Sequence, residues 1–150
     1  MKKIIGLVAL FFILTSCKKE AVLSDTYFAF GSAYNYCVGD CAHFFLISDS
    51  RLYADDMVRY APLTLKFKNT ALPNDKYILA KQLLDNFPRY LNNHPDTTFG
   101  CPDCYDQGGY HLQMKKNGEF INWHIDTDTL YQPVEIRNYI TDLKVLLQQL

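Results

Sequence analysis

One stretch of this chain constrains its fold more than any other: the run from Cys101 to Ile125, which is built around Asn117-Gly118. That dipeptide is the preferred centre of a two-residue type I′ hairpin turn, because both positions need a positive φ. Folding the flanks about this turn places apolar residues opposite one another on one face and mostly polar residues on the other. A shift of one residue would exchange the two faces, so the turn and the alternation predict the same register. The predicted apolar pairs are Met114 with Ile121, Leu112 with Trp123 and Tyr110 with Ile125, and the intervening pairs are Lys115 with Phe120, Gln113 with Asn122 and His111 with His124.

The first sixteen residues have the composition of a targeting segment rather than of a folded domain. Lys2 and Lys3 precede an apolar stretch, residues 4–14, that is too short for a transmembrane helix. The stretch ends in Leu14-Thr15-Ser16-Cys17, which resembles a bacterial lipobox. The resemblance implies cleavage before Cys17, a diacylglycerol on its sulfur and an acyl chain such as palmitate on its amine. Several acyl chains together anchor a protein stably, whereas a single chain binds marginally.

We therefore predict a lipoprotein signal peptide (1–16), a lipidated tether (17–26) and a single α+β domain (27–150). The expected location is the cell envelope, with the chain held by the lipid on Cys17 at the outer membrane, on its periplasmic or its surface face. Cleavage would leave 134 of the 150 residues, with 13 basic and 16 acidic side chains. No basic run follows Lys18-Lys19, so nucleic acid is not an expected partner.

Four cysteines remain after the lipidated one: Cys37, Cys41, Cys101 and Cys104. An even number of cysteines in an exported domain predicts two disulfides, because the compartment is oxidising. Three pairings are possible, and the sequence does not choose among them. Disulfides between the two clusters would close loops of about 64 residues and stabilise the fold by roughly 4 kcal/mol, whereas disulfides within each cluster would contribute less.

The same cysteines, and one pair of histidines, could instead carry chemistry. Cys101-Pro-Asp-Cys104 resembles the CPxC motif of thioredoxin-type redox proteins, which implies a nucleophilic Cys101. The four cysteines together could bind zinc tetrahedrally. The predicted cross-strand pair His111 and His124 could share a metal ion, or the two rings could repel each other when both are protonated. Without such a role, both side chains would lie exposed on the polar face, or one would pack under a loop. We expect no cofactor as the leading interpretation, with zinc as the alternative.

The rest of the chain alternates between strand and helix signals. Residues 27–36 are expected to begin as a strand, and Ala42–Ile47 and Leu52–Ala54 to form a second hairpin closed near Asp49-Ser50. Leu63–Phe67 is expected to be a further strand, at an edge of the sheet. A helix begins near its N-cap Asn74 and ends before Pro88, with its apolar stripe at Ile78, Leu79, Leu83, Leu84, Phe87 and Leu91. Pro133 opens a last helix, whose buried stripe is Ile136, Ile140, Leu143, Leu147 and Leu150.

This order predicts an α+β fold in which two hairpins form an antiparallel sheet and two helices pack on one face of it. The covered face is the one that carries Tyr110, Leu112 and Met114. The stretch from Asn92 to Gly100 is expected to be a polar loop.

Few residues point to catalysis. The carboxylates that could serve a hydrolase or bind calcium are Asp55, Asp56, Asp103, Asp106, Asp126 and Asp128, and all of them sit largely in predicted turns. The sequence contains no calcium-loop spacing, GxSxG elbow, phosphate loop or dinucleotide fingerprint.

Two family resemblances remain. The pattern Cys37-x-Gly-x-Cys41, followed by an apolar strand, a turn and Leu52-Tyr53, resembles the opening of small exported bacterial domains of unknown function. The pattern Asp106-x-Gly-x-Tyr110-x-Leu112, with its hairpin and closing helix, is similar to emfourin-type inhibitors of metallopeptidases. The lipobox and the lack of a complete catalytic set in the sequence predict a non-enzymatic binding role at the envelope, with a protein or a small ligand as the partner. The emfourin resemblance implies a peptidase as that partner and assigns no inhibitory residue.

Overall fold

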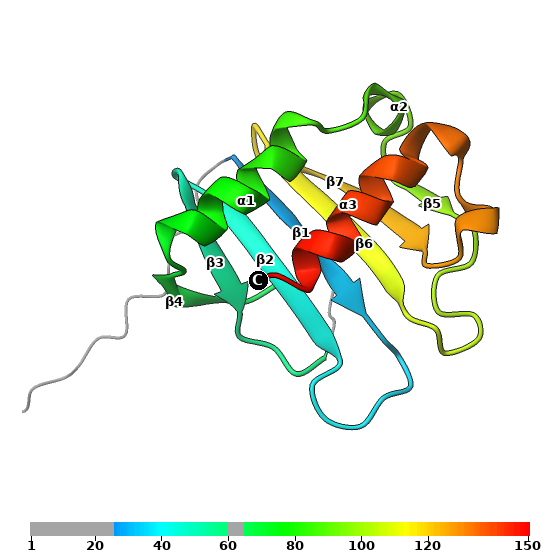
Figure 1. The fold of residues 1–150 in the computed structure, drawn as a ribbon, viewed down its shortest axis with the longest axis horizontal. Coiled ribbons are helices and arrows are strands. Elements are labelled where there is room, and N and C mark those ends of the chain that lie inside the picture. Colours follow the sequence, from blue (N-terminus) through cyan, green and yellow to red (C-terminus); the bar gives the residue numbers. More distant parts are fainter. Residues whose placement is uncertain (1–25, 60–64) are drawn as a thin grey trace, which may run out of the picture.

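The computed structural model of this chain describes residues 26–59 and 65–150. In them, a seven-stranded sheet carries helices on one of its faces, so the fold is α+β (Figure 1). The strands are β1 (Tyr27–Ala33), β2 (Ala42–Ser48), β3 (Arg51–Asp55), β4 (Phe67–Ala71), β5 (Thr97–Phe99), β6 (Gly109–Lys116) and β7 (Glu119–Asp126). The helices are α1 (Asn74–Asp85), α2 (Arg89–Asn92) and α3 (Arg137–Leu147), with 3-10 turns η1 (Thr129–Tyr131) and η2 (Val134–Ile136).

The sheet is mixed, and the prediction of an antiparallel sheet made of two hairpins was wrong. Its strand order is β4-β3-β2-β1-β6-β7-β5, so β1 lies between the two predicted hairpins and joins them. The remaining difference is β5, which runs parallel to β7 along the edge of the sheet. Residues 97–99 lie in the stretch expected to be a polar loop. Three residues are too few to show an alternating pattern, and pairing with the edge of β7 makes them a strand.

The β6–β7 hairpin has the predicted register at every pair, from Tyr110 opposite Ile125 to Lys116 opposite Glu119. Asn117 and Gly118 have φ values of 55° and 84°, as a type I′ turn requires. The turn and the alternating pattern therefore specify one arrangement, and the structure confirms it.

The β2–β3 hairpin is also confirmed, with Ser48 opposite Arg51 across the predicted turn. Both turn residues adopt positive φ, 49° at Asp49 and 57° at Ser50. An aspartate tolerates this conformation because its short side chain can hydrogen-bond locally. The last predicted strand is displaced: β4 shares only Phe67 with the predicted range, of which residues 63 and 64 lie outside the described part of the chain. Its place at the edge of the sheet is as predicted.

The core lies between the sheet and the helices, on the face that the alternation predicted. Trp123 is central to it: its ring is buried, and its Nε1 donates hydrogen bonds to the carbonyl oxygens of Leu91 at 3.1 Å and His94 at 2.8 Å. The ring of Phe87 packs against Trp123 and Tyr139, which joins the first and last helices to the hairpin. The largest fully buried side chains in this core are Trp123, Phe30, Leu52, Leu91, Leu112, Ile125, Ile136 and Leu143.

The first helix differs from its prediction in two ways. The N-cap position is occupied by Pro73, and Asn74 is already helical, because proline has no N–H to leave unpaired there. Ile78 is exposed, while Ala80 and Leu83 are the buried residues of α1. The predicted apolar stripe of α1 was therefore wrong at its first residue, Ile78, which faces solvent.

The last helix differs at both ends. Pro133 precedes the 3-10 turn η2, and α3 begins only at Arg137. Near the C-terminus Leu146 is buried more deeply than Leu147, which is partly buried. The predicted buried residues Ile136, Ile140 and Leu143 are confirmed.

In the described residues, the other face of the sheet carries no helix and has two unlike halves. Over β1 and β2, the side chains of Met57, Leu65 and Phe67 pack on small apolar clusters. Over β6 and β7, that face carries polar side chains, including the hydrogen-bonded pair Gln113 and Asn122, whose Nε2 and Oδ1 atoms are 2.8 Å apart. The histidine pair lies in this polar half.

Candidate functional site

The two disulfides form within the cysteine clusters. Cys37 bonds to Cys41, and Cys101 bonds to Cys104, with Cα–Cα distances of 5.8 and 5.5 Å. Of the three pairings that the sequence leaves open, the structure selects the one with the shortest loops.

Both disulfide loops lie at the same end of the sheet. Ala33, the last residue of β1, is opposite Gly109, the first residue of β6, so the loop after β1 and the loop before β6 are neighbours. Figure 1 shows them at the lower edge of the molecule, where β1 ends and β2 and β6 begin. We call this region the disulfide end.

The Cys37–Cys41 loop is attached to the sheet through its second cysteine. Cys41 is fully buried, while Cys37 is only partly so. The N–H of Tyr34 donates to the carbonyl oxygen of Cys41 at 3.0 Å, and the N–H of Cys41 donates to that of Val58 at 2.8 Å. Backbone hydrogen bonds and a buried sulfur therefore hold this loop.

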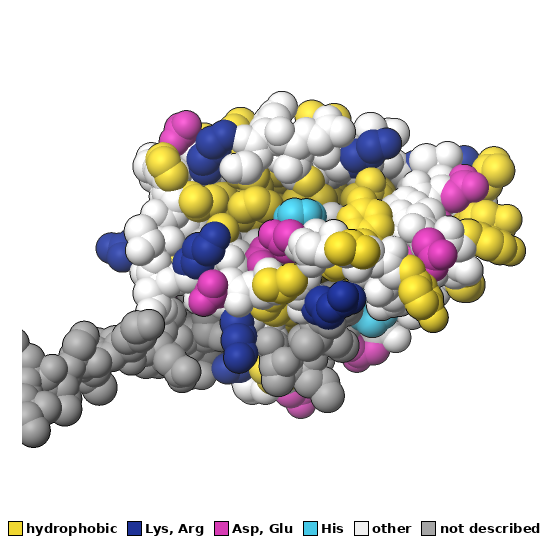
Figure 2. Space-filling model, turned by 90° about the horizontal axis from the view of Figure 1, so that it is seen from below, with side chains coloured by type: hydrophobic (Ala, Val, Ile, Leu, Met, Phe, Trp, Pro, Cys, Tyr) yellow, Lys and Arg dark blue, Asp and Glu magenta, His cyan; other side chains and the backbone are white. Residues whose placement is uncertain are grey.

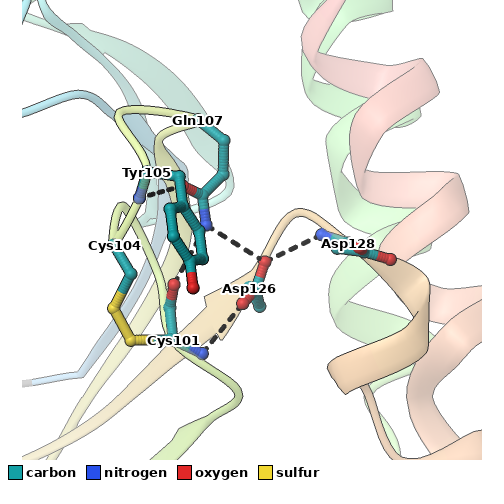
Figure 3. Close-up of a disulfide and its surroundings, with 6 residues drawn as sticks. All are labelled: Cys101, Cys104, Tyr105, Gln107, Asp126 and Asp128. Carbon is teal, nitrogen blue, oxygen red and sulfur yellow. Dashed lines mark hydrogen bonds between the residues drawn. A yellow bond between two sulfur atoms is a disulfide. The ribbon is translucent and has the colours of Figure 1, made fainter.

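The Cys101–Cys104 loop is held differently, by a buried carboxylate beneath an exposed disulfide (Figure 3). Asp126 is 1% exposed, and its Oδ2 accepts a hydrogen bond from the N–H of Cys101 at 2.8 Å. Its Oδ1 accepts from the N–H of Asp128 at 2.9 Å and from Nε2 of Gln107 at 3.4 Å. Gly100 has a φ of +75°, and a Cβ there would lie 2.6 Å from the Cβ of Asp126, so glycine allows the close approach. One carboxylate thus ties the loop to the turn after β7.

Asp103 joins the two disulfide loops to each other. Its Oδ2 accepts a hydrogen bond from the N–H of Asn35 at 2.6 Å, and its Oδ1 accepts one from the N–H of Gly108 at 2.8 Å. The ring of Tyr34 lies against Gly108, where a Cβ would come within 2.4 Å of the tyrosine Cε1. The two loops therefore form one connected surface.

This surface exposes aromatic and aliphatic side chains. Tyr36 is 82% exposed and Tyr105 is 85% exposed. Val38, in the Cys37–Cys41 loop, and Val58, whose carbonyl oxygen accepts from the N–H of Cys41, are exposed as well. Figure 2, which looks onto the disulfide end, shows hydrophobic side chains interspersed with charged ones over it. Hydrogen bonds and two disulfides hold these loops, and aromatic and aliphatic groups project from them into solvent.

The histidine pair is confirmed as cross-strand neighbours, at the edge of the disulfide end. His111 on β6 lies opposite His124 on β7, and their ring centroids are 4.7 Å apart in a T-shaped arrangement. They line a hollow of about 330 Å³ together with Ala33, Asn35, Thr98, Pro102 and Asp103. Burial, and secondarily the nearby His124, lowers the pKa of His111 to about 3, and burial lowers the pKa of His124. Both imidazoles are therefore neutral at pH 7.

The other predicted metal ligands are engaged elsewhere. The sulfurs of Cys37, Cys41, Cys101 and Cys104 are in disulfides, whereas zinc binds thiolates. In residues 26–59 and 65–150, no group of three or more His, Cys, Asp or Glu side chains is placed to hold a metal ion.

Four of the six predicted carboxylates, those of Asp55, Asp103, Asp126 and Asp128, accept hydrogen bonds from backbone N–H groups. Asp55 accepts from the N–H groups of Phe44 at 2.7 Å and Met57 at 3.0 Å, and Asp128 accepts from that of Leu130 at 2.9 Å. With Asp103 and Asp126, these residues hold loops at the ends of strands, which is turn chemistry.

Sequence reasoning missed the structural role of Asp126 and its partner Gln132. The Nε2 of Gln132, a buried residue, donates to the carbonyl oxygen of Asp126 at 2.7 Å. An aspartate at the end of a strand, followed two residues later by a second aspartate, is typical of a side chain that caps a turn. The sequence therefore indicates that Asp126 caps a turn, but it does not indicate that its carboxylate is buried.

Comparison with known proteins identifies no relative: no protein-family model matches this sequence, and no curated protein matches it either. The resemblances to small exported domains and to emfourin-type inhibitors therefore stay predictions. Across the part of the chain that the structure describes, none of the helices combines the length and the apolar character needed to cross a bilayer.

Proposed function

We propose that this chain is a lipid-anchored, non-enzymatic binding protein of the cell envelope, and that the disulfide end is its protein-binding surface. One observation carries the proposal: two disulfide loops, joined through Asp103, present Tyr36 and Tyr105 to solvent on a rigid base. Large aromatic side chains dominate the energetics of protein interfaces, and a surface held rigid before binding loses little entropy on binding.

The position of the anchor supports this assignment. The lipobox pattern places the lipid on Cys17, ten residues before β1 begins at Tyr27. The disulfide end lies at the opposite end of β1, a strand of seven residues that spans about 20 Å. The exposed tyrosines therefore lie at the end of the domain opposite the point where the tether joins β1. Two disulfides also fit an oxidising compartment outside the cytoplasm.

The concrete form of the proposal is inhibition of a metallopeptidase, with the disulfide end inserted into the peptidase cleft. The test is to measure inhibition constants of the chain against a panel of envelope and secreted metallopeptidases. Tyr36→Ala and Tyr105→Ala should each weaken inhibition about tenfold or more, because truncating an interface anchor typically costs at least 1.4 kcal/mol. Leu130→Ala is the matched control, since Leu130 is 79% exposed but lies in η1, outside the disulfide loops. If the chain inhibits none of the peptidases in the panel, this form of the proposal is wrong.

The anchor is tested separately. Cys17→Ser should abolish incorporation of labelled palmitate and move the chain from the membrane fraction to the soluble fraction. A chain that stays membrane-bound without Cys17 would contradict lipid anchoring.

A second candidate function is thiol–disulfide exchange at Cys101 and Cys104, which is favoured by the exposure of both residues. The segment after Cys101 is a turn followed by β6, so it lacks the helix that lowers the cysteine pKa in thioredoxin-type proteins. If exchange is the function, Cys101→Ser must abolish the reduction or oxidation of a test substrate protein, while Cys37→Ser leaves it intact. Equal activity in both variants would exclude it.

A further inference from the structure

The histidine pair has a feature that the proposed function does not use: it places two imidazole rings side by side on one face of the sheet. His111 and His124 occupy a non-hydrogen-bonded position of the β6–β7 ladder, counted from the two-residue turn. Side chains at such positions lie closest, and the ring centroids are 4.7 Å apart. The hairpin therefore holds both imidazoles in place before any ligand arrives.

Room for an ion is available beside these rings. They line the hollow of about 330 Å³, whose other wall is formed by Pro102 and Asp103 of the Cys101–Cys104 loop. Gly109 keeps the space beside His111 open, since a Cβ at that position would lie 2.7 Å from the Cβ of Pro102 and 3.4 Å from Nε2 of His111. The carboxylate of Asp103 lines the same hollow and brings a negative charge that favours a cation there.

We propose that His111 and His124 bind a copper(II) ion as a pair of nitrogen ligands, with water completing its coordination. Copper(II) is the divalent first-row ion with the highest affinity for a given set of nitrogen donors, and it accepts a tetragonal arrangement of nitrogen and oxygen ligands. A structural zinc site needs four protein ligands, whereas no group of three or more His, Cys, Asp or Glu side chains in the described residues is placed to hold one ion. Both carboxylate oxygens of Asp103 already accept hydrogen bonds, from the N–H groups of Asn35 and Gly108. The inference is independent of what binds to the exposed tyrosines.

The test is a titration of the full chain, purified in detergent, with copper(II) buffered by glycine, followed by electron paramagnetic resonance. We expect one copper ion per chain, with hyperfine splitting from two nitrogens. His111→Gln and His124→Gln should each weaken binding about tenfold or more, because each removes one of the two nitrogens. His43→Gln is the matched control: His43 is an exposed histidine on β2, and its loss should leave the affinity unchanged.

A second readout uses the unaltered chain, in case a glutamine variant folds poorly. Substoichiometric copper(II) should broaden the ring resonances of His111 and His124 before those of His43 and His94. No binding, equal loss in the His43→Gln control, broadening that begins at His43 or His94, or a preference for zinc over copper would each overturn the proposal.

Discussion

The two disulfide loops of this protein are similar in size but are held by different means. Cys37–Cys41 has one fully buried sulfur, and its backbone is bonded to neighbouring strands and loops. Cys101–Cys104 is exposed, and the buried carboxylate of Asp126 anchors it from below. A short disulfide stabilises little by itself, so each loop depends on what lies beneath it. The Cys37–Cys41 loop should therefore be destabilised by changes in packing, and the Cys101–Cys104 loop by changes in charge and hydrogen bonding.

The largest effect should come from Asp126→Ala. It leaves the N–H groups of Cys101 and Asp128 without their acceptor, and we expect a loss of about 3 to 4 kcal/mol in the free energy of unfolding. Urea denaturation measures it. Hydrogen exchange should quicken at the Cys101 amide and stay unchanged at the Cys41 amide, which bonds to Val58. Equal quickening at both amides would show that the loops are not held independently.

Removing each disulfide in turn should lower the free energy of unfolding by a smaller amount, and by a different amount for each loop. Either loop contributes about 2 kcal/mol through chain entropy, but replacing the buried Cys41 by serine also costs about 1 kcal/mol of core packing. We therefore expect Cys37→Ser/Cys41→Ser to lose about 3 kcal/mol and Cys101→Ser/Cys104→Ser about 2 kcal/mol, by the same denaturation assay. The reverse order would mean that burial of Cys41 adds nothing.

Lowering the pH should destabilise the Cys101–Cys104 loop through His111, which lines the same hollow as Pro102 and Asp103 of that loop. Its pKa is about 3 in the folded state and 6.5 as the ordinary value, so the unfolded state binds the proton first as the pH falls. The stabilisation that depends on a neutral His111 is fully present above pH 6.5 and is lost as the pH falls from there toward 3. The loss in the free energy of unfolding is about 2 kcal/mol at pH 5. His111→Gln should flatten this slope between pH 7 and pH 5, whereas His43→Gln should leave it as it is. An unchanged slope in His111→Gln would contradict the assignment.

The smallest effect on stability is expected at the exposed aromatics. Tyr36 and Tyr105 each lie on one of the two loops and are more than four-fifths exposed, so alanine at either position should change the free energy of unfolding by less than about 0.5 kcal/mol. Thermal denaturation checks this. A larger loss at Tyr105 alone would mean that its ring helps to hold the second loop.

Local sequence signals were sufficient for the two hairpins. Asn117-Gly118 and the alternation from Tyr110 to Ile125 determined the β6–β7 register at every pair, and Asp49-Ser50 marked the second turn. Both depend on residues close in the chain, where φ preference and alternation give the same answer. The helix positions were less accurate, because the burial of Ala80 in place of Ile78 depends on what the sheet presents to α1.

The candidate site depended on the sequence for its residues and on the fold for its arrangement. The histidine pair could be predicted because it belongs to one hairpin. The disulfide pairing could not, since four cysteines allow three connectivities and only the positions of their Cα atoms in space choose among them. The role of Asp126 was equally hidden, because a carboxylate in a turn has the same sequence signature whether it is solvated or buried.

By itself, then, the sequence determined the hairpins, the helical segments, the covered face of the sheet and the pairing of His111 with His124, all of which follow from short-range periodicity and turn chemistry. The tertiary structure decided the joining of the hairpins by β1, the parallel strand β5, the disulfide pairs and the bond between Asn35 and Asp103. Except for the disulfides, these contacts link residues far apart in the chain, and the disulfide pairs depend on where the folded loops place the four Cα atoms. Their free energy exists only once the sheet has closed, so no local pattern records them.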